Sequence, residues 1–282
     1  MKIYIVIPAH NEAGFIGKTL QSLVEQSFLP SKIVVVDDQS SDKTVEIVSE
    51  FIQKYPFISL VKNISSEEHL PGSKVINAFH KGYETLDEEY DIICKFDADL
   101  IFPKDYLKSI TGHFQENPKI GMVGGFCSIL KNEKWILENL TDKDHLRGAI
   151  KAYRKACFLD IGNLKPAMGW DTADELLAQF HGWFVKTDKK LLVKHLKPTG
   201  TTYNLSSKYR QGEAFYRLRY GFLITSIASA KLAYLKNDLS LFKDYLHGYS
   251  KAKKEKQPFL VTKEEGRFIR KLRWKKMRKK IL

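Results

Sequence analysis

Short apolar runs alternate with helical patterns over residues 1–100 of the chain. The expected strands are 3–7, 32–36, 58–62 and 92–96, and the expected helices are 17–26, 42–55 and 74–86. The strand runs are rich in Ile and Val, whereas the segments between them repeat apolar residues at the spacing of one helix face. Strands without polar interruptions need cover on both faces. The pattern therefore predicts an α/β fold with a Rossmann-like, mostly parallel central sheet and helices on both faces.

The alternation weakens after Pro103. Residues 106–114 have a helical pattern and 120–130 a strand pattern, and 209–246 are dense in apolar and aromatic residues, which predicts one or two C-terminal helices. We expect four segments. They are two halves of one α/β domain (1–105 and 106–205), an apolar helical segment (206–250) and a basic tail (251–282).

The formal net charge of +13 is unevenly distributed along the 282 residues. From Lys251 onward the chain holds 14 Lys and Arg against three acidic residues, which leaves only +2 for everything before. A basic segment on a near-neutral body favours docking to an acidic surface, here an anionic membrane, and the apolar segment 220–235 could lie in the membrane interface. A solvated basic face is the structural alternative. A nucleic-acid-binding protein is the alternative from another class, because Phe268 and Trp274 lie among the cations. It leaves the acidic residues described below unexplained, so no nucleic acid partner is expected.

Three features bear on the compartment. The apolar run before Pro8 is too short for a signal peptide. Charge-free stretches such as 220–230 fall far below the ~20 residues that span a bilayer. Cys94, Cys127 and Cys157 are odd in number and lack metal-site spacing, which is typical of core thiols in a reducing compartment. We expect a cytoplasmic protein without a spanning helix.

Acidic residues follow three of the expected strands. The segments are Pro8–Glu12, Asp37–Asp42 and Asp97–Asp99. The carboxyl ends of parallel strands meet at one edge of a sheet, where ligands bind. Asp97 and Asp99 are two residues apart, so on extended backbone both side chains leave the same face and could share a divalent cation. A solvated turn, and helix capping by residues 40–42, are the structural alternatives.

Phosphate chemistry is also constrained by what the sequence lacks. Neither GxGxxG nor GxxxxGK[ST] occurs, which disfavours a dinucleotide-dependent dehydrogenase and a Walker-type ATPase. Lys74 follows Gly72 and Ser73 at the start of an expected helix, where a cation and a helix N-terminus would suit a phosphate group. A plain surface loop is the alternative.

Together these motifs resemble a known family. The segments 5–12 (IVIPAHNE), 34–42 (VVVDDQSSD) and 95–99 (KFDAD) are similar in order and spacing to the nucleotide-sugar-dependent glycosyltransferases of family 2, over about residues 1–105. The resemblance implies the GT-A fold, a UDP- or GDP-sugar as donor, and Mn²⁺ or Mg²⁺ as cofactor. It places residues 1–105 on the donor and 106–205 on the acceptor. The implied nucleotide-binding residues are Pro8, Ala9, Asn11, Glu12, Asp38, Lys74 and Asp97, and the implied metal ligands are Asp97, Asp99 and His195.

The family's acidic cluster corresponds here to residues 169–177 (GWDTADELL), which lack its literal Glu-Asp pair. The catalytic base is therefore expected among Asp171, Asp174 and Glu175, with Asp174 favoured and Asp171 next; N-capping of a helix is the structural alternative. His195 follows an expected strand, and an ordinary hydrogen-bonded histidine is its alternative.

The expected reaction is inverting transfer of one sugar to a hydroxyl of a glycan or lipid-linked acceptor. The Q-x-x-R-W motif of processive synthases is absent, which disfavours polymerisation. A retaining transferase with the same fold stays open. A sugar nucleotidyltransferase is a further alternative, although it should carry a Gly-rich, Arg-containing loop after the first strand. We expect a role in polysaccharide or lipopolysaccharide synthesis. The basic tail indicates that the enzyme works at the inner face of the cell membrane.

Overall fold

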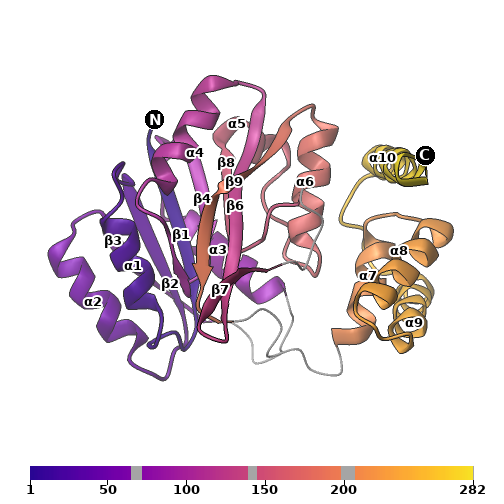
Figure 1. Ribbon diagram of the computed structural model, residues 1–282, viewed down its shortest axis with the longest axis horizontal. Helices are drawn as coiled ribbons and strands as arrows, with labels where there is room; N and C mark the ends of the chain where they lie inside the picture. Colours follow the sequence, from indigo (N-terminus) through magenta and orange to yellow (C-terminus); the bar gives the residue numbers. More distant parts are fainter. Residues whose placement is uncertain (65–71, 139–144, 198–206, 282) are drawn as a thin grey trace.

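A nine-stranded sheet forms the centre of the computed structural model, which describes residues 1–64, 72–138, 145–197 and 207–281 (Figure 1). Four parallel strands come first, in the order β3 (Ile58–Asn63), β2 (Lys32–Asp38), β1 (Ile3–Ala9) and β4 (Ile92–Phe96). Their bounds and their order along the chain agree closely with the apolar runs. The expected α/β sheet is confirmed.

The second half completes the sheet with mixed pairing. β8 (Ile150–Arg154) lies antiparallel between β4 and β6 (Ile120–Lys131), and β9 (Phe184–His195) runs parallel to β6. The short β5 (Leu100–Ile101) pairs antiparallel with the end of β9, and β7 (Lys134–Leu137) forms a hairpin with β6. Residues far apart in sequence, such as Leu100 and His195, thereby become direct neighbours.

Helices cover both faces of the sheet, as the uninterrupted apolar strands require. Alternate strand residues enter two cores: Ile5 and Val35 pack with α1 (Ile16–Val24) and α4 (Tyr106–Glu116), and Val6 and Val34 pack on the other face. The remaining helices of the α/β part are α2 (Thr44–Lys54), α3 (Ser73–Tyr83), α5 (Lys155–Asp160) and α6 (Trp170–Phe180). The three cysteines are buried free thiols.

The C-terminal region contains three further helices and a fourth that packs against α6. These are α7 (Ser207–Arg217), α8 (Phe222–Leu235), α9 (Ser240–Lys254) and α10 (Lys263–Ile281). α7 and α9 cross at two glycines, since a Cβ on Gly212 would lie 1.7 Å from the Tyr245 carbonyl and one on Gly248 would lie 1.9 Å from that of Tyr209. Only glycine permits so close a crossing.

The basic segment from residue 251 is helical over most of its described length. Its first residues end α9, and α10 packs its apolar side on the body, where Ile269 is fully buried and the Phe268 ring lies 5.6 Å from that of Phe180. Among the described helices, none is long and apolar enough to cross a membrane.

Candidate active site

The turns after β1 and β2 hold each other through side-chain to backbone hydrogen bonds. Asn11 and Gln39 adopt positive φ angles of 53° and 60°, which turn the chain sharply at each strand end. The Asn11 amide donates to Ser40 Oγ (2.9 Å), and the Ser41 amide donates to Asn11 Oδ1 (2.8 Å). The two expected nucleotide-binding segments therefore form one rigid edge, as β1–β2 pairing at Ala9 and Asp37 requires.

Asp38 and Glu12, at this edge, each have one carboxylate oxygen in contact with another side chain. Asp38 is buried and accepts a hydrogen bond from Asn63 of β3 on Oδ1 (2.7 Å). Glu12 Oε1 pairs with Lys197 Nζ at 2.6 Å, whereas its buried Oε2 has no hydrogen-bond partner among the described residues. Burial raises the pKa of Glu12, and the nearby Asp97 and Asp99 add to the rise against the opposing Lys197.

Asp97 and Asp99 leave the end of β4 in a loop that is fixed from both sides. Thr19 of α1 donates to the carbonyl of Ala98 (2.7 Å) and accepts from the Leu100 amide (3.0 Å). Asp97 pairs through Oδ1 with the buried Lys95; burial alone would raise the pKa of Asp97, but this cation lowers it overall. Its charge is thus kept beside the strand end.

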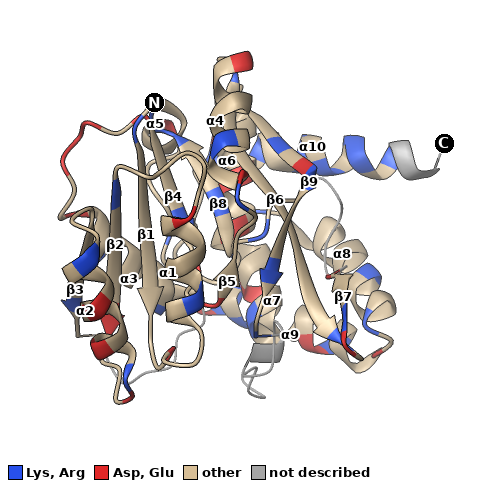
Figure 2. Cartoon of the chain, turned by 60° about the vertical axis from the view of Figure 1, so that its left-hand side comes forward, with Lys and Arg blue, Asp and Glu red and all other residues tan. Residues whose placement is uncertain are grey.

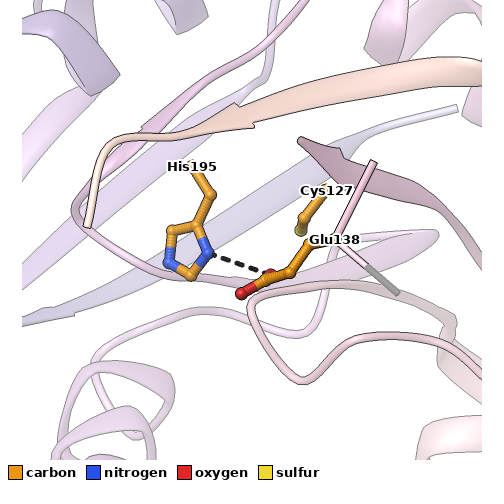
Figure 3. Close-up of side chains that lie close together, drawn as sticks. All are labelled: Cys127, Glu138 and His195. Atoms are coloured by element: carbon orange, nitrogen blue, oxygen red, sulfur yellow. Dashed lines mark ion pairs between the residues drawn. The ribbon is translucent and has the colours of Figure 1, made fainter. Parts of the chain in front are cut away.

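His195 connects the end of β9 to this loop. Its Nε2 lies 3.3 Å from Asp99 Oδ2, and its Nδ1 lies 3.5 Å from Glu138 Oε2 (Figure 3). Burial opposes protonation, but the two carboxylates outweigh it and raise the pKa of His195 to about 9. Cys127, Glu138 and His195 form the one described group of at least three such side chains whose ligand atoms all lie within 4.8 Å.

These residues offer the donor types that a divalent cation takes, but among the described residues the ligand atoms of Asp97, Asp99 and His195 do not all lie within 4.8 Å of one another. Within the described chain, the side-chain contacts of Asp97 and Asp99 each use one carboxylate oxygen, and Glu12 likewise uses only one. Three carboxylates that influence one another and keep oxygens without partners are the hard donor set that Mg²⁺ and Mn²⁺ prefer. Asp99 and His195 are brought together as expected, while Asp97 is turned toward Lys95.

Asp174 of α6 is enclosed. Its side chain is 2% exposed, and both oxygens accept hydrogen bonds from Lys151 Nζ, at 2.8 and 2.9 Å. Tyr153 donates to Oδ2 (2.6 Å) and the Glu175 amide to Oδ1 (2.7 Å). Burial would lower the pKa of Lys151, but Asp174 and its acidic neighbours raise it overall. Asp174 is therefore enclosed, and both of its oxygens belong to a buried ion pair.

Asp171, one helix turn earlier, is more open. Its side chain is 35% exposed and contacts His145 Nε2 with Oδ2 at 3.6 Å. Burial would raise its pKa, but His145 and Lys151 lower the pKa of Asp171 to about 2, so it stays ionised. Glu175, which is 9% exposed, accepts from the Leu146 amide (2.8 Å) and pairs with His145 Nδ1 (2.9 Å).

Lys95 and Gly148 lie between the carboxylates at the strand ends and those on α6. Lys95 Nζ, which pairs with Asp97, also donates to the carbonyl of Gly148 (3.2 Å). On the other side, a Cβ added to Gly148 would lie 3.3 Å from the Cβ of Asp171 and 2.9 Å from the Trp170 ring. The strand-end carboxylates and Asp171 therefore border one region of the molecule.

The start of α3 lies against the loop that leads to α6. Gly72 has φ 80°, and a Cβ there would lie 2.7 Å from the carbonyl of Ala167. Ser73 Oγ donates to the Pro166 carbonyl (2.9 Å). Lys74, in the first turn of α3, is half-buried. The residue before Gly72 lies outside the described chain.

Two charged residues were not found from the sequence. Glu138 lies 3.0 Å from the guanidinium of Arg147, and the charge of Arg147 helps to lower the pKa values of both Asp97 and Asp171. Neither belongs to a motif, because both come from the stretch between β7 and β8 that carries no periodic pattern. The Arg147–Gly148 pair just before an apolar strand was the one local signal.

Comparisons with known proteins agree with this architecture. The sequence model of Glycosyl transferase family 2 matches residues 4–161. The chain is 27% identical over 218 residues to "Probable glycosyltransferase YdaM" of Bacillus subtilis (strain 168), covering 74% of this chain and 48% of that protein. It is 25% identical over 189 residues to a poly-beta-1,6-N-acetyl-D-glucosamine synthase of Staphylococcus epidermidis, covering 60% of this chain and 42% of that protein. The chain spans about half the length of the curated relatives it matches.

Solved structures share the fold at low sequence identity. The mannosyltransferase PcManGT from Pyrobaculum calidifontis, in complex with GDP-Man and Mn²⁺, superimposes with a TM-score of 0.57 at 16% identity over 89% of this chain and 69% of that one. S. aureus TarS 1-349, in complex with UDP-GlcNAc, gives 0.57 at 20% identity over 80% and 66%. The sheet order, the covered faces and the family match over more than half of the residues lead to one conclusion: the chain has the GT-A fold and belongs to glycosyl transferase family 2.

Proposed function

We propose that the protein transfers a sugar from a UDP- or GDP-sugar to an acceptor hydroxyl, with inversion and with a divalent cation. The observation that carries the proposal is the Asp99–His195 pair after β4 and at the end of β9. Asp99 lies in the same loop as Asp97, which pairs with Lys95. Lys95 contacts Gly148, and Gly148 packs against Asp171. The family match supports transfer chemistry. The complexes of PcManGT with GDP-Man and Mn²⁺ and of TarS with UDP-GlcNAc support the donor and cofactor classes.

Asp97, Asp99 and His195 would hold the cation, with Mn²⁺ or Mg²⁺ as the candidates. When bound, the metal would neutralise the charge that develops on the leaving nucleoside diphosphate. Asp99 and His195 already lie within 3.3 Å of each other. Lys95 keeps Asp97 ionised and oriented at the strand end. The chain thus supplies two carboxylates, and the proton that the raised pKa keeps on His195 would leave as the cation binds.

The proposed base moves from Asp174 to Asp171. A base must reach the acceptor hydroxyl and take up its proton as the new bond forms. Both oxygens of Asp174 are already occupied by Lys151 and Tyr153. Asp171 is ionised, keeps one oxygen outside its pair with His145 and is one third exposed. Glu175 is proposed to orient His145, because it pairs with that ring and is itself held by the Leu146 amide.

The nucleotide pocket is proposed at the edge formed by the turns after β1 and β2. Pro8 and Ala9 end β1, and Asn11, Glu12 and Asp38 surround the crossing of the two turns. The hydrogen bonds between these turns fix the edge in advance, so little ordering is left for donor binding. Lys74, at the start of α3, is proposed as a cation for the diphosphate.

The acceptor is proposed to be a glycan or a lipid-linked hydroxyl used in polysaccharide or lipopolysaccharide synthesis. A relative with a polysaccharide synthase name supports this class. The basic C-terminal residues would bring the enzyme to an anionic membrane, at the cytoplasmic face.

A panel of UDP- and GDP-sugars with Mn²⁺ tests the activity, with release of nucleoside diphosphate as the readout. We expect release from one donor class, and an inverted anomeric configuration in the product. Conversion of the nucleotide sugar and added pyrophosphate into nucleoside triphosphate and sugar 1-phosphate would instead indicate a sugar nucleotidyltransferase, and retention would exclude a single displacement.

The choice of base is tested with two matched variants, Asp171→Asn and Asp174→Asn. We expect kcat to fall at least ~10²-fold in Asp171→Asn with unchanged thermal stability. In Asp174→Asn, kcat among folded molecules should fall less than stability does. The reverse pattern would return the base to Asp174.

A further inference from the structure

Helix α8 is apolar on both its buried and its exposed side. The buried side carries Ile224 (4% exposed) and the fully buried Thr225 and Ser229, whereas the outward side carries Leu223 (60% exposed) and Tyr234 (80% exposed). The buried hydroxyl groups of Thr225 and Ser229 have no hydrogen-bond partner among the described residues. A surface helix ordinarily presents a polar side to solvent. The exposed apolar side of α8 therefore indicates contact with an apolar environment.

The outward residues form a continuous stripe. Leu223, Ile227, Ala230 and Tyr234 follow one another at intervals of four, three and four residues, which places them on one face of the helix. Leu235 and Leu239 are exposed at its end. We call these six residues, Leu223, Ile227, Ala230, Tyr234, Leu235 and Leu239, the apolar stripe. Scattered apolar residues on a surface are normal, but a contiguous row of this kind marks an interaction site.

Two lysines and one aspartate lie along the apolar stripe. α8 contains no acidic residue and one lysine, Lys231, whereas Lys236 and Asp238 follow its end. On α10 the exposed residues Arg267, Lys271, Lys275 and Arg278 recur every three or four positions and form a cationic stripe. The two acidic residues of α10 both lie in its first turn.

α10 and the start of α8 are in contact. Arg273 donates to the Tyr220 hydroxyl (2.5 Å), and Arg270 lies 3.8 Å from the position of a Cβ on Gly221. Figure 2 shows α10, with its many blue residues, above α8 and extending beyond the body of the molecule. The two helices that carry the apolar and cationic stripes are therefore in contact near the start of α8.

We propose that this region docks on an anionic lipid bilayer, with the apolar stripe of α8 at the level of the headgroups and acyl chain ends and the cationic stripe of α10 on the lipid phosphates. The inference rests on the proposed membrane location and names the surface responsible for it. Apolar insertion combined with lysine and arginine is the chemistry that holds interfacial helices on anionic membranes. A second copy of the chain is disfavoured as the occupant, because two cationic stripes would be brought together.

Co-sedimentation of the full chain with phosphatidylglycerol-containing vesicles tests the apolar stripe. The variant is Leu223→Ser with Leu235→Ser, and its matched control is Leu29→Ser with Leu159→Ser, in which both leucines are likewise more than half exposed but lie elsewhere. We expect binding to weaken on the order of tenfold in the first double variant and to stay within twofold of the parent in the control. Equal binding by both would overturn the proposal.

The cationic stripe is tested by Lys271→Glu with Lys275→Glu. The control is Lys104→Glu with Lys108→Glu, an exposed pair at the same spacing near α4. We expect at least ~10-fold weaker binding for the first pair only, and loss of parental binding on vesicles of phosphatidylcholine alone. Binding that ignores lipid charge, or a dimer in light scattering that the α8 variant abolishes, would contradict the proposal.

Release of nucleoside diphosphate in the absence of vesicles separates this inference from the proposed reaction. The α8 and α10 variants should keep the parental rate, because neither stripe contributes residues to the candidate active site. A protein that binds vesicles but turns over no sugar nucleotide would refute the reaction and leave the docking surface standing.

Discussion

The carboxylates at the strand ends and those on α6 differ in how many of their oxygens the protein itself uses. Glu12, Asp97 and Asp99 each engage one oxygen with a described cationic neighbour, whereas Asp174 uses both oxygens and accepts from Lys151, Tyr153 and a backbone amide. Both groups are acidic and both are partly or fully buried. Burial alone therefore does not distinguish the two groups, whereas the number of carboxylate oxygens already in use does.

Asp171 belongs, by this criterion, with the strand ends. It lies on the same helix as Asp174 and three residues away, yet one of its oxygens remains outside its contact with His145. A helix can therefore present a structural carboxylate and a chemically available one on successive turns. Four predictions test this division.

The largest effect is expected for Asp99→Asn. Losing a charged ligand of the proposed cation should lower kcat/KM for the donor by about 10³-fold, equivalent to about 4 kcal/mol of transition-state stabilisation. Steady-state release of nucleoside diphosphate measures it, with urea unfolding as the check on the fold. Activity within tenfold of the parent would remove Asp99 from the site.

Asp174→Ala should mainly affect stability. It leaves the ammonium of Lys151, which is 0% exposed, facing a cavity, and unpairing a buried ion pair costs about 3–5 kcal/mol. The matched change Asp171→Ala should cost less than about 1 kcal/mol, because its partner is a single histidine and the side chain is partly solvated. Urea titrations of both variants decide. Equal losses of unfolding free energy in the two variants would contradict a structural role for Asp174 that Asp171 lacks.

His145 predicts the pH dependence of the α6 cluster. Burial lowers its pKa, but Asp171 and Glu175 outweigh this and raise it from 6.5 to about 9. A raised pKa means that the folded state holds the proton more tightly, so this stabilisation is complete below pH 6.5 and is lost as the pH rises through 9. The loss from His145 should be about 3 kcal/mol. His195, whose pKa is likewise raised to about 9, adds to the slope of both the parent and the His145 variant.

The variant His145→Gln isolates that contribution. Its free energy of unfolding should be flatter than that of the parent between pH 6.5 and 9, because Asp171, with a pKa of about 2, does not titrate there. Chemical denaturation at pH 6, 7.5 and 9.5 measures the slope. A parental slope in the variant would assign the pH dependence to another group.

The smallest effect is stabilisation by Mn²⁺. At a free concentration of ten times Kd, a cation bound only by the folded state adds about 1.4 kcal/mol. The shift in unfolding midpoint should disappear in Asp99→Asn and persist in Asp171→Asn. A shift retained in both would place the cation elsewhere, with the Cys127, Glu138 and His195 group as the next position to examine.

Much of the fold could be predicted from the sequence. The four parallel strands, their order of appearance and the helices between them follow from local apolar patterns, which need no knowledge of distant residues. The motifs after β1, β2 and β4 could be placed at one edge for the same reason. The mixed second half could not, because β6, β8 and β9 pair across long separations and β6 carries an irregular register.

The candidate site divides in the same way. The acidic types at 97, 99, 171, 174 and 175 could be named from sequence, but not their state. Asp174 is neutralised by Lys151 and Tyr153 from β8, more than 20 residues away, and Glu138 and Arg147 enter from a stretch without any pattern. Contacts of this kind depend on strand pairing, which a local pattern does not encode.

The sequence by itself determined the α/β class, the family resemblance and the set of acids at the strand ends, because periodicity and spacing are properties of neighbouring residues. Only the tertiary structure decided which carboxylates are enclosed and which keep an open oxygen. It also decided that α8 exposes large apolar residues such as Leu223 and Tyr234. Those properties depend on what packs against each side chain, and the packing partners come from other elements of the chain.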